Sequence, residues 1–153
     1  MRSNSIRLSR RHEWFAYAVC AAVFGTGAAW AWLHYFPLAP NEFGAPSPAE
    51  GWILKAHGAA AMVALLLLGT LLPMHVKFAW RAGRNLRTGL SLLSVFAFLV
   101  LTGYGLYYAG GEHLRAWLSA AHLWVGLALL PVFLLHIWRG KTTRPGRRRA
   151  VKN

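Results

Sequence analysis

The sequence predicts an all-α integral membrane protein, a bundle of four transmembrane helices with both termini in the cytoplasm. Of its 153 residues, 56% are hydrophobic, and the mean hydropathy is +0.36, which is too apolar for an ordinary soluble domain. Four nearly uncharged stretches reach the roughly 20 residues that a helix needs to span a bilayer. They are residues 14–36, 52–76, 88–109 and 116–138.

The placement of positive charge predicts the orientation of these helices. Arginine and lysine gather before the first stretch, between the second and third, and after the fourth. The other two connections carry Glu42, Glu50 and Glu112, with only Lys55 and Arg115 as nearby cations. This alternation is what the positive-inside rule requires of four spans with cytoplasmic termini. We therefore assign the net charge of +13 to topology and to contact with anionic lipid, in preference to nucleic-acid binding.

The first helix, residues 14–36, has a basic start and a long apolar run, as expected of a retained signal anchor. Proline residues mark Pro37–Gly51 as an outer loop. The second helix, 52–76, ends near Lys77, and a short basic loop, Phe78–Arg87, follows it.

The third helix, 88–109, stops at the breaker pair Gly110-Gly111. Few residues separate it from the fourth helix, 116–138, so we expect these two helices to be antiparallel neighbours. Residues 1–140 should form one membrane domain, and residues 141–153 a basic, disordered cytoplasmic tail. Cys20 is the only cysteine, so no internal disulfide and no C-x-x-C-H attachment of a c-type haem is expected.

Four histidines lie inside the apolar stretches, His57 and His75 in the second and His122 and His136 in the fourth. Ionisable side chains at membrane depth are costly, so each of them predicts a function. Eighteen residues separate His57 from His75, which is five full turns at about 100° per residue, so both should share one face. The same count places His122 and His136 within about 40° of one face.

The topology pairs these histidines by depth, because the second and fourth helices run in the same direction. His57 and His122 fall in the outer half, and His75 and His136 fall close to the inner boundary. Histidines on facing helices can supply the two axial imidazoles of a haem iron. We therefore predict an outer haem iron held by His57 and His122 and an inner one held by His75 and His136.

The two layers are unequally spaced in this scheme. They lie about 27 Å apart along the second helix and about 21 Å apart along the fourth, at 1.5 Å per residue. Helix tilt, or kinks at Pro73 and Pro131, would absorb the difference. His34, near the outer end of the first helix, is an alternative outer ligand, whereas His12 and His113 lie at helix ends and should be solvated.

Glycines near the histidines would leave room for a macrocycle, although small residues are also common at membrane helix contacts. The candidates are Gly25, Gly27, Gly58, Gly103, Gly105 and Gly126. Cations near the helix ends would suit haem propionates, although topology and snorkelling explain them equally. These cations are Lys55 and Arg115 outside and Arg81, Arg84 and Arg139 inside.

The sequence segments around the four histidines resemble the di-haem membrane cytochrome b family. The segments are KAHGAAAMV, LPMHVKF, SAAHLWVGL and LLHIWRG, and the last two are similar to cytochrome b subunits of hydrogenases, formate dehydrogenases and b561-type proteins. The resemblance covers about residues 50–140. Those subunits usually take one ligand from the first helix. Here the second and fourth helices offer all four, as in the cytochrome b of quinol–cytochrome c reductases.

The resemblance implies an electron-transfer subunit with two b haems, in the bacterial inner membrane. It would pass electrons between the quinone pool and a partner redox protein of the respiratory chain, and would not act as a stand-alone enzyme. No nucleotide-binding fingerprint is present. All four acidic residues lie outside the spans, which argues against a proton relay or a hard-cation path. The alternative is a haem-free anchor or assembly subunit of a larger complex.

Overall fold

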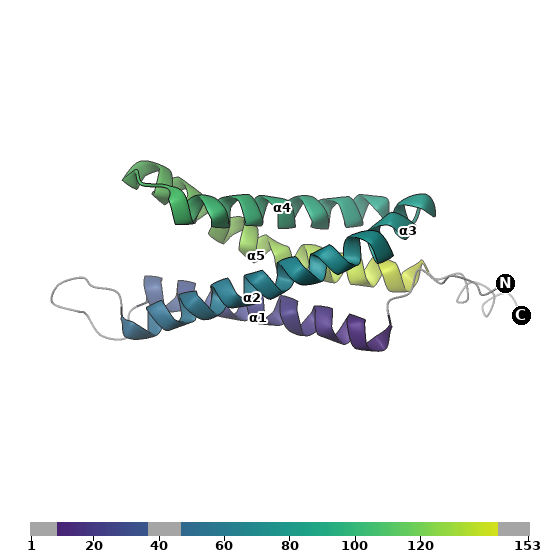
Figure 1. The fold of residues 1–153 in the computed structure, drawn as a ribbon, viewed down its shortest axis with the longest axis horizontal. Coiled ribbons are helices and arrows are strands. Elements are labelled where there is room, and N and C mark those ends of the chain that lie inside the picture. Colours follow the sequence, from purple (N-terminus) through teal and green to yellow (C-terminus); the bar gives the residue numbers. More distant parts are fainter. Residues whose placement is uncertain (1–8, 37–46, 144–153) are drawn as a thin grey trace, which may run out of the picture. The chain divides into compact units, whose positions relative to one another are not determined.

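The computed structural model describes residues 9–36 and 47–143, and every regular element in these ranges is a helix. Four helical rods are long and apolar enough to cross a membrane. The second rod is continuous from Pro48 to Arg81 but contains three elements. The elements are α1 (Arg10–Tyr35), α2 (Pro48–Leu71), the π-helical segment η1 (Leu72–Val76), α3 (Lys77–Arg81), α4 (Leu86–Tyr108) and α5 (Glu112–Thr142) (Figure 1). The predicted all-α class with four membrane-spanning helices is confirmed.

Large apolar side chains cover the outside of these rods. Leu66 is 73% exposed and Leu101 is 70% exposed, both in mid-helix. Such exposure would be costly in water but is expected where lipid is the solvent. Tryptophans near the helix ends are exposed as well, for example Trp52 and Trp117 at 70% and 75%, as in an interfacial aromatic belt. The chain is therefore an integral membrane protein.

Several helix ends differ from the prediction. The segment 78–81, expected in a loop, is helical, and so are Lys141 and Thr142, expected in the tail. Cations mark where a helix leaves the bilayer, and the helix itself continues until the backbone is broken. The break comes at Gly83 and Asn85, which adopt left-handed conformations with φ of 62° and 52°. The predicted tail from residue 144 and most of the predicted outer loop lie outside the described residues.

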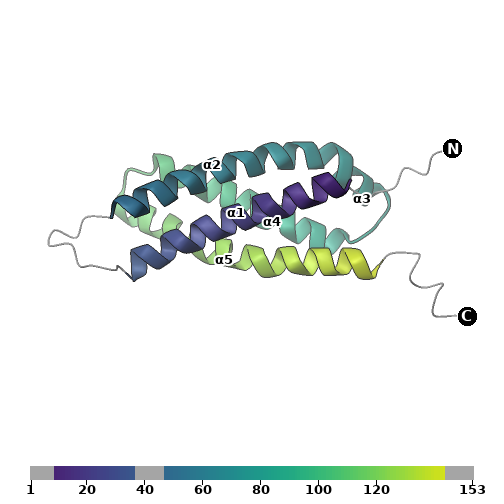
Figure 2. The same ribbon diagram turned by 90° about the horizontal axis from the view of Figure 1, so that it is seen from below.

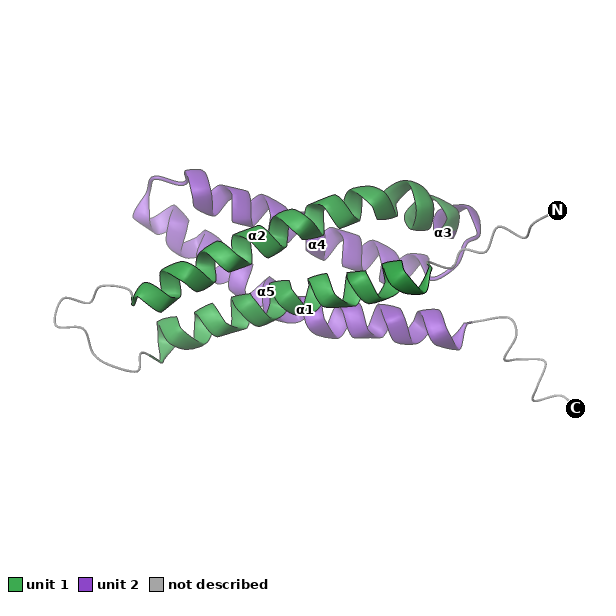
Figure 3. Ribbon diagram, turned by 60° about the horizontal axis from the view of Figure 1, so that its bottom comes forward, with its two compact units in different colours: residues 1–78 green, residues 79–153 purple. Residues whose placement is uncertain are grey.

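The chain divides into two compact units, residues 1–78 and 79–153 (Figure 3). Each contains one helical hairpin. In the first unit α1 and α2 lie side by side (Figures 1 and 2). Their buried apolar side chains are few and small or medium in size: Ala16, Val19, Ala64 and Leu67. Small residues let membrane helices approach closely without a hydrophobic driving force.

The start of α2 is set by a capping box. The Ser47 side chain accepts a hydrogen bond from the Glu50 backbone N–H at 3.3 Å, and the Ser47 backbone N–H donates to Glu50 Oε1 at 3.2 Å. Pro48 occupies the first turn, where its missing N–H costs nothing. These caps start the helix at Pro48, inside the segment that was predicted as a loop.

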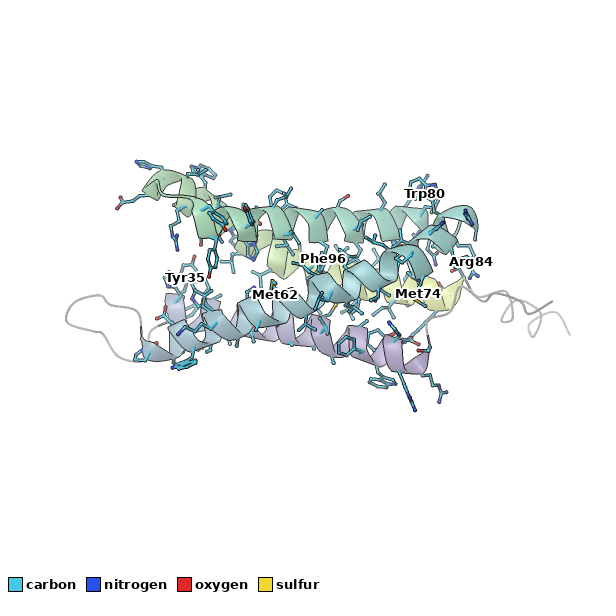
Figure 4. The ribbon with its side chains drawn as sticks, in the orientation of Figure 1. Tyr35, Met62, Met74, Trp80, Arg84 and Phe96 are labelled. Atoms are coloured by element: carbon cyan, nitrogen blue, oxygen red, sulfur yellow. The ribbon has the colours of Figure 1, made fainter. Side chains whose placement is uncertain are left out.

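In the second unit α4 and α5 lie side by side, and polar contacts tie both ends of the hairpin. At one end Arg84, labelled in Figure 4, donates to the Thr143 carbonyl at 3.0 Å, and Asn85 Nδ2 donates to Thr143 Oγ1 at 3.1 Å. At the other end Arg115 donates to the Leu106 carbonyl at 3.0 Å. These bonds satisfy terminal backbone groups and hold α5 in register with α4.

Candidate functional site

The four predicted ligands belong to three elements. His57 lies in α2 and His75 in η1, both in the first unit, and His122 and His136 lie in α5 of the second unit. All four side chains are partly buried. Each hairpin therefore holds two of the predicted ligands, which make their described contacts within that hairpin.

In the first hairpin His57 meets a threonine of the neighbouring helix. Nδ1 of His57 lies 3.0 Å from Oγ1 of Thr26. The Thr26 hydroxyl also lies 2.6 Å from the carbonyl oxygen of Ala22, four residues earlier in α1. Bonding of this kind to the preceding turn is common for threonine in helices, and it fixes the hydroxyl in place beside the imidazole.

The second hairpin repeats this contact twice. Oγ1 of Thr102 lies 2.9 Å from Nδ1 of His122, and Oγ1 of Thr88 lies 3.3 Å from Nδ1 of His136. Both threonines are buried, with 5% and 9% exposure. Their hydroxyls again donate to their own helix, Thr102 to the Phe98 carbonyl at 2.9 Å and Thr88 to that of Asn85 at 3.2 Å.

These paired contacts favour one tautomer of each imidazole. A threonine hydroxyl has one proton, and in all three cases a backbone carbonyl lies where it can accept that proton. The oxygen then faces the histidine as an acceptor, so Nδ1 carries the ring hydrogen. Nε2 is left as the nitrogen with the lone pair that can bind a metal. Histidine ligands usually donate their second ring N–H in this way, which fixes the ring and raises its basicity.

A glycine follows each of the three threonines and lies against the same imidazole. A Cβ atom added at Gly27 would lie 3.1 Å from Cε1 of His57, and one at Gly103 would lie 3.3 Å from Cε1 of His122. A Cβ atom added at Gly89 would lie 3.6 Å from Cε1 of His136. The Thr-Gly dipeptide thus supplies a hydrogen-bond acceptor and, one residue later, the space in which the ring lies.

Sequence reasoning found two of these glycines and none of the threonines. Gly27 and Gly103 were predicted to lie near a ring, whereas Gly105 faces Leu118 instead. The overlooked pattern is visible in the sequence, because the chain contains three Thr-Gly dipeptides, at 26–27, 88–89 and 102–103. In the structure the glycine of each dipeptide lies against a histidine ring.

The second hairpin holds its two contacts in one antiparallel register. Fourteen residues separate Thr88 from Thr102, and fourteen separate His122 from His136. A straight helix drifts about 20° for every seven residues, and left-handed supercoiling of neighbouring helices removes that drift. The offset of about 40° expected between His122 and His136 therefore does not prevent both from contacting α4.

The backbone around His75 is π-helical, whereas the other three histidines lie in α-helices. The Lys77 N–H bonds the Leu72 carbonyl, a bond between residues five apart, and Pro73 lies inside this π-helical turn. A π turn takes up more residues than an α turn. The count of five α-helical turns from His57 to His75 therefore does not hold unchanged beyond Leu72, and the shared face stays a prediction.

His34, the alternative outer ligand, makes a different contact. Its Nδ1 lies 3.3 Å from Oε2 of Glu50, the buried carboxylate of the capping box, and its ring stacks on Trp30 at 4.7 Å between centroids. This pair connects α1 to the first turn of α2. The structure thus gives His34 a role at the end of the hairpin.

Cations that were candidates for haem propionates also have partners within their own units. Lys55 Nζ lies 4.6 Å from the centre of the Trp52 ring. Arg115 and Arg84 donate to the backbone carbonyls of Leu106 and Thr143. These contacts favour the alternative explanation, in which the cations cap helix ends and set topology.

Within residues 9–36 and 47–143, no group of three or more histidine, cysteine, aspartate or glutamate side chains could hold a metal ion. A haem needs fewer protein donors, because the porphyrin supplies the equatorial nitrogens and the protein only the axial ones. Comparisons with known proteins give no further guide, since no family model, curated protein or solved structure matches the chain.

Proposed function

We propose that the protein is a membrane electron-transfer subunit that carries two b haems, each with two histidine ligands. In this proposal His57 and His122 ligate the outer iron, and His75 and His136 ligate the inner one. The supporting observation is the contact of Nδ1 with a threonine hydroxyl at His57, His122 and His136. With Nδ1 as the donor in this contact, Nε2 would be the ligating nitrogen at three of the four predicted positions.

The residues around these histidines fit a haem. A haem bound there would supply a one-electron iron couple. Thr26 and Thr102 would hold the imidazoles of the outer ligands, and Gly27 and Gly103 leave the rings the space they occupy. The apolar helices would exclude water, which raises the cost of any charge change at the metal and so influences its potential.

The proposal places the electron path across a bacterial inner membrane, with the chain termini on the cytoplasmic side. The electrons would pass between the quinone pool and a partner redox protein. A quinol releases two electrons and two protons, and each iron would accept one electron at a time. Two irons at different depths would let these electrons cross the bilayer one after the other.

An optical spectrum tests the proposal directly. Purified full-length protein from haem-replete cells should show a reduced-minus-oxidised b-type spectrum and two haems per chain. Replacing any one of His57, His75, His122 and His136 by alanine should remove one haem. Replacing the exposed His113 should remove none.

The same variants test the pairing by depth. His57→Ala and His122→Ala should lose the same haem, identified by its midpoint potential, and the other two variants should lose the other haem. Loss of one haem by both His57→Ala and His75→Ala would show that the pairing is wrong. A colourless, monodisperse wild-type protein would refute the electron-transfer proposal and favour the haem-free anchor.

A further inference from the structure

We infer that Thr26, Thr102 and Thr88 are positioning residues that set the reduction potentials of the two haems through the histidines they contact. The inference rests on the proposed function and adds to it a means by which the protein tunes each iron. A threonine is not a ligand, so its effect must pass through Nδ1 of the histidine opposite it.

The geometry restrains both partners in each contact. On the threonine side, the bond to the preceding helical turn holds Oγ1 in one position, at 2.6 Å from the acceptor for Thr26 and 2.9 Å for Thr102. On the histidine side, the glycine after each threonine lies against Cε1 of the ring. The ring therefore has one orientation, in which Nδ1 meets the hydroxyl and the edge that carries Cε1 lies against the glycine.

A structural explanation of the same bonds must be separated from this one, because threonine hydroxyls also join membrane helices without any further role. Thr70 provides the comparison within the chain. Its hydroxyl donates to the Leu67 carbonyl at 2.7 Å, like the others, but that is its only described hydrogen bond and no glycine follows it. Thr70→Val removes the same kind of backbone bond without changing a predicted ligand.

The direction of the effect follows from electron donation. An Nδ1–H that donates a hydrogen bond makes the imidazole a more basic ligand, and a more basic ligand favours ferric over ferrous iron. Removing the acceptor should therefore raise the potential. We expect the ferric preference to fall threefold to tenfold, which is about 30–60 mV at 59 mV per tenfold change for one electron.

The threonine contacts described in the structure involve both proposed haems. Both ligands of the outer iron, His57 and His122, contact a threonine, whereas for the inner iron the structure describes such a contact at His136. Thr26→Val and Thr102→Val should therefore shift the same potential, and Thr88→Val should shift the other one. A general loss of stability would not shift one potential in two variants and the other potential in the third.

The experiment is a redox titration of the purified full-length protein, followed optically, with the ferric low-spin electron paramagnetic resonance signals recorded on the same samples. The variants are Thr26→Val, Thr102→Val and Thr88→Val, with Thr→Ser at each position and Thr70→Val as the matched control. The valine variants should shift one potential upward each, the serine variants should restore it, and the control should match the wild type.

Several outcomes would overturn the inference. One is a valine variant whose potentials equal those of Thr70→Val, and another is a shift that serine does not reverse, since that would identify packing as the cause. Loss of haem from a valine variant that serine prevents supports positioning. Absence of haem from the wild type would instead refute the proposed function, so the two failures are distinguishable.

Discussion

Gly27 is the position where one added methyl group would come closest to a proposed ligand. The added Cβ would lie 3.1 Å from Cε1 of His57, and nothing lies within 4 Å of a Cβ added at Gly25, one half-turn earlier in the same helix. Contacts at 3.1 Å require the ring to move, and Thr26 holds the neighbouring Nδ1 atom of the same ring. Residue 27 therefore limits where the imidazole can lie.

This contrast gives a residue-scale prediction. Gly27→Ala should displace the His57 ring and reduce occupancy of the outer haem at least tenfold, in line with the loss seen when groups that orient a metal ligand are changed. Gly69→Ala, at a glycine of α2 where nothing lies within 4 Å of an added Cβ, should retain both haems and gain up to about 1 kcal/mol of helix stability. Haem content per chain and thermal unfolding measure both effects, and equal haem loss in the two variants would contradict the assignment.

At the scale of elements, the π-helical segment η1 determines where His75 points. Pro73 has no N–H to bond the Gly69 carbonyl, which weakens the α-helical pattern at this turn. Each residue added to or removed from a turn rotates the following side chains by about 100°. His75 therefore has its present direction only while the π turn persists.

Pro73→Ala restores an N–H at position 73 and should convert η1 to an α-helix. The rotation of His75 should then remove the inner haem and leave the outer one, which a redox titration would show as loss of one of two components. Pro131→Ala is the control, since α5 is already α-helical through its proline. It should keep both haems and add up to about 3 kcal/mol to the free energy of unfolding. Unchanged titration of Pro73→Ala would refute this account of η1.

At the scale of the whole molecule, the distribution of charge predicts that both termini are cytoplasmic. Single cysteines can test this after Cys20→Ala removes the native thiol. A membrane-impermeant maleimide added to intact cells should label Asn41→Cys, in the predicted outer loop, and should not label Asn153→Cys. After the cells are permeabilised, both should react. Labelling of Asn153→Cys in intact cells would show that the orientation is reversed.

Much of the helical organisation could be predicted from the sequence, because apolar length and charge placement act over whole segments. The four spans were found, and their ends were missed by several residues where a local feature decides them, as at the Ser47 capping box and the left-handed Asn85. The direction of His75 could not be derived by counting, since the π turn depends on backbone bonds around Pro73 that a count of α-helical turns assumes to be regular.

The predicted ligands were chosen from histidine alone, which is informative in a membrane because ionisable groups are rare there. The threonines that contact them were overlooked, since one hydroxyl in an apolar helix is unremarkable and becomes meaningful only with its partner on the next helix. Their repeated Thr-Gly pattern at 26–27, 88–89 and 102–103 could have indicated them.

The antiparallel register of α4 and α5 also limits how the length of this chain can vary. Thr88 and Thr102 are as far apart in sequence as the histidines that they meet. A single residue gained or lost between the threonines, without a matching change between the histidines, would break one of the two contacts. Insertions and deletions in related chains should therefore be confined to the connections and the tail, and the fourteen-residue spacing on both helices should be kept even where most other side chains differ.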